Sequence, residues 1–148
     1  MNLYSQPSSI EPVTILLVDD DDVDAMGIER AIAKLQIDNP LVRARDGVEA
    51  LEILHNGATV AAPYLILLDL NMPRMNGLEL LAKLRQDPQL SSSVVFVFTT
   101  SQDAQDKLAA YKLNVAGYIF KQRKSDGFIR VMDMLNHYCN VVELPAPL

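Results

Sequence analysis

Short apolar runs separated by helical stripes constrain the fold of this chain more than any other feature. Residues 15–18, 64–68 and 94–98 read ILLV, YLILL and VVFVF, and nearly unbroken apolar runs of this length are typical of strands buried on both faces. Residues 41–45, LVRAR, alternate between apolar and basic side chains and predict an edge strand. Residues 117–120, GYIF, are the fifth candidate strand.

The segments between these runs carry apolar side chains three and four residues apart, which predicts helices. The stripes are Ile28, Ala31, Ile32 and Leu35; Val48, Leu51 and Leu54; Leu78, Leu81 and Leu84; Ala104, Leu108, Tyr111 and Val115; and Phe128, Val131, Met132 and Leu135. Five strands alternating with five helices favour an α/β fold, a single (βα)5 domain whose doubly wound parallel sheet has helices on both faces.

The length of 148 residues suits one domain. We expect a flexible N-terminal arm at 1–12, the domain at 13–138, and a C-terminal tail at 139–148 that contributes to a homodimer. The formal charge of −6 argues against direct binding of nucleic acid, because such binding needs a basic face. No apolar run approaches the ~20 residues of a membrane span, and a single cysteine suits a cytoplasmic protein.

Polar side chains stand where the predicted strands end. Asp19 and Asp20 follow the first strand, Asp69 the third, Thr99 the fourth and Lys121 the fifth. Function in open α/β sheets collects at the carboxyl ends of the strands, so we expect these groups to converge. Carboxylates about 4 Å apart repel by roughly 4 kcal/mol at an effective dielectric constant near 20. A hard divalent cation such as Mg²⁺, which prefers oxygen ligands, would relieve that repulsion.

The acidic run at 18–24, VDDDDVD, contains more carboxylates than one cation needs. We interpret Asp21, Asp22 and Asp24 as a solvated acidic turn in which Asp22 caps the first helix. In the same way, Ser101 is the expected cap of the fourth helix. A carboxylate beside a bound cation can act as a nucleophile toward a phosphoryl group, while a lysine and a hydroxyl neutralise the phosphoryl oxygens.

Four motifs in order, VDDDDVD, LLDLNMPRMNG, FTTS and GYIFK, resemble those of response-regulator receiver domains of the CheY type. The resemblance covers nearly the whole chain and implies a flavodoxin-like sheet with strand order 2-1-3-4-5. It also implies a protein that is not an enzyme but a phosphoacceptor in a two-component system. The motif after the third strand and the C-terminal VVELP further resemble stand-alone regulators that partner phytochrome-type histidine kinases.

The resemblance implies a role for each residue at the strand ends. Asp69 would be the phosphoacceptor, and Lys121 would pair with the phosphoryl oxygens. Asp20 would bind Mg²⁺ directly, with Asp19 holding the ion through a water molecule or sharing the site. The backbone carbonyl of Asn71 would be a further metal ligand.

Two residues would form the switch that the resemblance implies. Thr99 would move to bind the phosphoryl group, and the aromatic ring of Tyr118 would follow it. The expected partners are a sensor histidine kinase and a downstream protein target or phosphorelay partner. This sequence departs from the family at Gln122, where members usually have a proline, and we expect a trans peptide bond there.

Other functions remain open at this point. A phosphorylation-independent adaptor of the same fold would bind partners without switching. A phosphatase with an aspartate nucleophile would need a second carboxylate at position 71, where the chain has Asn71. A flavin-binding domain would need a phosphate-binding loop after the first strand, where this chain has carboxylates.

Overall fold

The computed structural model describes residues 12–145 apart from residues 123 and 125. The strands are β1 Thr14–Val18, β2 Leu41–Ala44, β3 Tyr64–Leu68, β4 Val94–Thr99 and β5 Gly117–Phe120. The helices are α1 Asp22–Leu35, α2 Gly47–Asn56, α3 Gly77–Gln86, α4 Ala104–Lys112 and α5 Gly127–Val141. The predicted alternation of strands and helices is confirmed.

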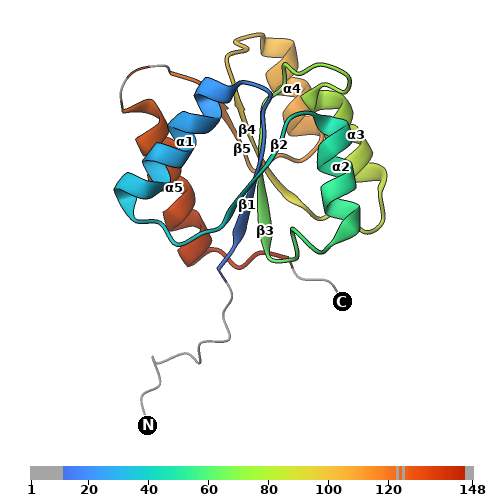
Figure 1. Cartoon of the computed structure of the whole chain (residues 1–148). Coiled ribbons are helices and arrows are strands. Elements are labelled where there is room, and N and C mark those ends of the chain that lie inside the picture. The colour runs from blue at the N-terminus through green and yellow to red at the C-terminus, as the bar shows by residue number, and fades with distance from the viewer. Residues whose placement is uncertain (1–11, 123, 125, 146–148) are drawn as a thin grey trace.

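The five strands form one parallel sheet in the order β2-β1-β3-β4-β5, as predicted (Figure 1). Val18 pairs with Leu68 across β1 and β3, and Leu68 pairs with Val97 across β3 and β4. Because these pairs lie near the carboxyl ends of their strands, the residues that follow them meet at one edge of the sheet.

Helices cover both faces of the sheet, with α1 and α5 on one side and α2, α3 and α4 on the other (Figure 1). Alternate strand residues enter the two cores, since successive side chains of a strand point to opposite faces. Leu16 and Ile66 belong to the core under α2, α3 and α4, whereas Leu17 and Leu67 belong to the core under α1 and α5. Burial on both faces explains why the central strands are apolar at almost every position.

Carboxylates and an amide cap the first four helices. Asp21 accepts hydrogen bonds from the backbone amides of Val23 and Asp24 at the start of α1, so the prediction that Asp22 caps this helix is wrong. Asp103 caps α4 in the position that we predicted for Ser101. The observed caps lie one and two residues away from the predicted ones, because neighbouring aspartates are equally good caps.

The predicted apolar stripe of α4 does not face the sheet. Leu108 and Tyr111 are exposed, and the buried residue of the helix is Ala110. Periodicity indicates an apolar face but not what that face contacts, and here it faces outward. Val115, the last residue of the predicted stripe, is buried beyond the end of the helix.

The C-terminal boundary differs from the predicted one, and most of the predicted N-terminal arm is not described by the structure. The predicted arm at 1–12 lies outside the described residues except for Pro12, as do residues 146–148 of the predicted tail. Cys139 was the predicted start of the tail, but α5 continues to Val141. None of the helices in the described part of the chain has the length and hydrophobicity of a membrane-spanning segment.

Candidate functional site

The residues predicted from the strand ends lie together at the carboxyl edge of the sheet. Backbone hydrogen bonds extend the strand pairing into the site: the amide of Asp69 donates to the carbonyl of Val18 at 2.9 Å, and the amide of Lys121 donates to the carbonyl of Thr99 at 2.7 Å. These bonds fix the backbone that carries Asp69 and Lys121. The two side chains are therefore positioned by the sheet itself.

Asp19, Asp20 and Asp69 form a cluster in which carboxylate oxygens lie within 4.8 Å of one another. Asp19 and Asp69 are buried, whereas Asp20 is exposed at the mouth of the site. Burial raises the pKa of the Asp19 carboxyl, although hydrogen bonds from Lys121 and from the amide of Asp21 oppose the shift. Three carboxylates with an open side fit the oxygen ligands that Mg²⁺ and similar cations prefer.

Lys121 lies buried at the centre of the acidic site. Its Nζ atom is 2.8 Å from Oδ2 of Asp19, 2.9 Å from Oδ2 of Asp24 and 3.3 Å from Oδ2 of Asp69. Burial alone would lower the pKa of Lys121, but the hydrogen bonds to Asp19 and Asp24 raise it above its usual value. The ammonium group is therefore charged and directed at the predicted phosphoacceptor.

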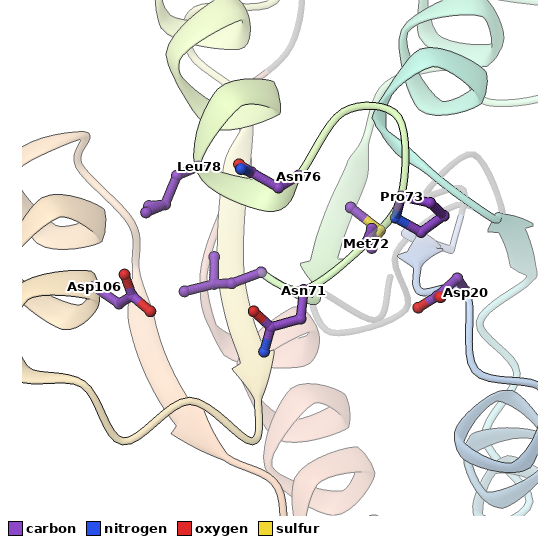
Figure 2. A pocket seen from close by; sticks show the side chains of 8 residues that line it. Asp20, Asn71, Met72, Pro73, Asn76, Leu78 and Asp106 are labelled. Atoms are coloured by element: carbon purple, nitrogen blue, oxygen red, sulfur yellow. The ribbon is translucent and has the colours of Figure 1, made fainter.

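A pocket of about 420 Å³ opens beside the carboxylate cluster (Figure 2). Asp20 and Asn71 line it, and Asp106 reaches it from the first turn of α4. The backbone amide of Asn71 lies 3.3 Å from Oδ1 of Asp69, which places the loop after β3 against the carboxylate. The pocket is large enough for a phosphoryl group, and its lining residues Leu70 and Asn71 directly follow Asp69 in the chain.

The two predicted switch residues are linked through Ser101. Thr99 is fully buried, and its Oγ1 accepts a hydrogen bond from the amide of Ser101 at 3.2 Å. The hydroxyl of Tyr118 donates to the carbonyl of Ser101 at 3.0 Å, and the Ser101 hydroxyl donates to Asp106 at 2.7 Å. Burial raises the pKa of Tyr118. A movement of Thr99 would therefore reach Tyr118 through a single residue.

Sequence reasoning missed Asp24 as a member of the site. We predicted a solvated side chain, but Asp24 is 1% exposed and pairs with Lys121. The spacing places Asp24 in the first turn of α1, but no local signal indicates that Lys121, 97 residues further along the chain, pairs with it. The peptide bond between Lys121 and Gln122 is trans as predicted, since the cis bond among the described residues joins Ala62 and Pro63.

The fold and the site define a class of protein, and comparison with known families agrees. The model of the response regulator receiver domain matches residues 15–133. The chain therefore belongs to the response regulator receiver family of two-component signalling proteins. The resemblance predicted from the four motifs is confirmed.

Two of the most similar known proteins are the response regulators Rcp1 and RcpA. Rcp1, a response regulator of Synechocystis sp., is 37% identical over 139 residues, which cover 91% of this chain and 95% of Rcp1. The Mn²⁺-bound structure of Rcp1 matches with a TM-score of 0.81 over 91% of this chain and 100% of that one. The phosphorylated structure of RcpA, a cyanobacterial phytochrome response regulator, is 32% identical with a TM-score of 0.81, and the match covers 92% of this chain and 100% of RcpA. The predicted likeness to phytochrome-associated regulators is thus confirmed.

Proposed function

We propose that this chain is a stand-alone response regulator that accepts a phosphoryl group on Asp69 from a sensor histidine kinase, with Mg²⁺ as the bound cation. The observation that carries the proposal is the position of the Asp69 carboxylate. It lies 3.3 Å from the ammonium group of Lys121 and within 4.8 Å of ligand oxygens of Asp19 and Asp20. A nucleophile, a counter-charge and a metal-binding set therefore share one open site.

The transfer needs little covalent chemistry from the protein. An oxygen of Asp69 attacks phosphorus, the bond from phosphorus to the donor nitrogen breaks, and its electron pair stays on the nitrogen, which leaves protonated. A bound divalent cation supplies positive charge against the equatorial phosphoryl oxygens. Lys121 stabilises the same charge, and the hydroxyl of Thr99 donates to a phosphoryl oxygen after the transfer.

The donor set supports a hard divalent cation. Asp19, Asp20 and Asp69 offer carboxylate oxygens, and the backbone carbonyl of Asn71 is the fourth proposed ligand. The Mn²⁺-bound structure of the relative Rcp1 supports divalent metal binding by the family. We assign Mg²⁺ here because it commonly serves sites built from one or two carboxylates plus phosphate oxygens.

The phosphorylated state signals through protein contacts. Thr99 and Tyr118 act as the switch, and the surface of α4, β5 and α5 carries the change. Exposed apolar side chains on that surface, Leu108, Tyr111 and Phe120, suit a protein partner or phosphorelay protein. The switch is thus a local electrostatic event that biases a surface for binding.

A homodimer is proposed for the C-terminal end of the chain. Val141 and Val142 are exposed there, whereas Tyr138 and Leu144 pack against the core under α1 and α5. Val141 and Val142 are therefore available for a symmetric contact with a second copy of the chain. Tyr138 and Leu144 anchor this segment to the domain. The likeness to RcpA, a phytochrome response regulator, supports a phytochrome-type kinase as the phosphodonor. We further propose that the protein acts in the cytoplasm.

The test is direct phosphorylation with a small donor. Wild-type protein is mixed with Mg²⁺ and phosphoramidate, and intact mass and oligomeric size are measured. The expected result is a gain of about 80 Da that is lost on adding EDTA beforehand and in the variant Asp69→Asn. Asp38→Asn, at an exposed loop carboxylate, is the matched control and should gain the same mass.

Each alternative predicts a different outcome in the same experiment. A phosphorylation-independent adaptor would show no mass gain in the wild type. A phosphatase would turn over many equivalents of a phosphomonoester, which the amide of Asn71 disfavours because it cannot protonate a leaving group. If Asp69→Asn still gained this mass, the phosphoacceptor would be a residue other than Asp69.

A further inference from the structure

Asp24 is a buried carboxylate that the proposed chemistry does not yet use. It lies in the first turn of α1, is 1% exposed, and places Oδ2 at 2.9 Å from Nζ of Lys121. Its neighbours Asp21 and Asp22 in the same run are not buried. Burying a carboxylate is costly unless a close counter-charge compensates, and Lys121 supplies one here.

The three carboxylates around Lys121 are not equivalent. An ammonium group has three donors, and Asp19, Asp24 and Asp69 each place an oxygen within 3.3 Å of Nζ. Among the described residues, Asp19 and Asp69 belong to the cluster close enough to share a cation, and Asp24 lies outside that cluster. Asp24 is therefore the partner of Lys121 whose oxygens the cation does not need.

The difference matters once the site is loaded. A bound cation would draw on oxygens of Asp19 and Asp69, and a phosphoryl group would occupy an oxygen of Asp69. Neither demand falls on Asp24, so its 2.9 Å hydrogen bond from Lys121 can persist in the loaded site. We propose that Asp24 is a positioning residue that holds the ammonium group of Lys121 beside Asp69 during phosphoryl transfer.

This inference rests on the proposed function and makes Asp24 act through Lys121. It therefore predicts that Asp24 has no effect on the reaction once Lys121 is absent, which a purely structural role does not predict. A double-mutant cycle separates the two roles, because residues that act as a unit are not additive. The four proteins are the wild type, Asp24→Ala, Lys121→Met and the double variant.

The initial rate of phosphorylation by phosphoramidate and the affinity for Mg²⁺ are measured on each protein. Removing a residue that orients a functional group costs about 10-fold or more in activity, so we expect that loss of rate in Asp24→Ala. The affinity for Mg²⁺ should change less than the rate. The double variant, which combines Lys121→Met with Asp24→Ala, should be phosphorylated at a rate within about two-fold of that of Lys121→Met alone.

A conservative variant and a control complete the experiment. Asp24→Asn keeps an acceptor of the same shape without the charge, so its rate should fall between those of Asp24→Ala and the wild type. Should Asp24→Ala not fold, the cycle is run with Asp24→Asn. Asp22→Asn removes an exposed carboxylate of the same turn and should phosphorylate at the wild-type rate.

Several results would overturn the inference. If both Asp24 variants were phosphorylated at the wild-type rate, the inference would be wrong. It would also be wrong if Asp24→Ala lowered the rate by the same factor in the presence and in the absence of Lys121. A fall in Mg²⁺ affinity that matches the fall in rate would make Asp24 part of the metal site instead. The proposed function fails separately, because in that case the wild type itself gains no phosphoryl group.

Discussion

The ammonium group of Lys121 lies 3.3 Å from Oδ2 of Asp69, and the hydrogen-bonded backbone of β4 and β5 holds it there. With Asp19, Asp20 and Asp24 close by, the carboxylates of the site outnumber this single cation. Such an arrangement stays under electrostatic strain until more positive charge arrives. From this excess of negative charge we expect the proposed cation to stabilise the fold as well as to take part in the chemistry.

Mg²⁺ should therefore stabilise the folded protein, and Asp20 should be needed for this effect. A ligand that binds only the folded state at 100 times its Kd raises the free energy of unfolding by about 2.7 kcal/mol. We expect an increase of this order in the wild type and most of it to be lost in Asp20→Asn, as measured by urea unfolding with and without Mg²⁺. Asp22→Asn, an exposed carboxylate of the same run, should keep the full increase. Equal stabilisation of both variants would argue against Asp20 as a ligand.

Arg85 should be a strong determinant of stability away from the site. Its guanidinium donates to the carbonyls of Leu113 and Ser93 at 2.7 Å, Ser91 at 2.8 Å and Asn114 at 3.0 Å, and so ties α3 to the end of α4. Arg85→Met leaves these carbonyls without their donor and should cost about 2–3 kcal/mol in the free energy of unfolding.

The control for Arg85 is an arginine on the surface of a different helix. Arg30 is exposed on α1, and Arg30→Met should change the free energy of unfolding by less than about 0.5 kcal/mol. Chemical denaturation of both variants makes the comparison. If Arg85→Met and Arg30→Met lowered the free energy of unfolding by similar amounts, the hydrogen bonds from Arg85 to the four carbonyls would not contribute to stability.

Asp46 should make stability depend on pH in the acid range. The hydrogen bond from Arg74 at 2.7 Å, and then that from the amide of Glu49, hold the pKa of this carboxyl below its usual value. A carboxyl with a lowered folded-state pKa contributes stability that is present above the unfolded-state pKa and is lost as pH falls through the folded-state pKa. The stability advantage of the wild type over Asp46→Asn should therefore shrink between about pH 5 and pH 2.

Unfolding by urea at several pH values tests this expectation. Asparagine is also a good N-cap, so Asp46→Asn keeps the cap of α2 and removes mainly the charge. When Asp46→Asn is made in the background Arg74→Met, its pH-dependent effect on the free energy of unfolding should be smaller, because the main cause of the pKa shift is gone. A difference that stays constant from neutral to acid pH would contradict the assignment.

The site residues that stand at the ends of the strands could be predicted from the sequence, because two strong signals indicate them. Buried parallel strands give apolar runs that are hard to mistake, and the polar residue after each run then lands at the same edge of the sheet. Asp19, Asp69, Thr99 and Lys121 were found in this way. Their distances were not predictable, since side-chain geometry depends on the packing around each strand.

The burial of Asp24 and the orientation of α4 could not be read from the sequence. A carboxylate is buried only if a counter-charge reaches it, and Lys121 is 97 residues away along the chain. In α4 the spacing of Leu108 and Tyr111 is that of an ordinary buried stripe, yet both are exposed. Local patterns carry no information about which partner a charge finds or which way an apolar face turns.

Gly77 should be required for the geometry around Asp69, the proposed phosphoacceptor. A Cβ atom at this position would clash with the backbone carbonyl oxygen of Asp69 and lie 2.7 Å from Cα of Leu70. Gly77→Ala must therefore shift α3 or the carbonyl that follows β3, which should cost about 1–3 kcal/mol and slow phosphorylation of Asp69. Gly57→Ala is the control, because Gly57 has a φ of +70° but no atom within 4 Å of a Cβ. It should cost about 1 kcal/mol through backbone strain alone and leave the phosphorylation rate unchanged, so equal rates in the two variants would refute the role of Gly77.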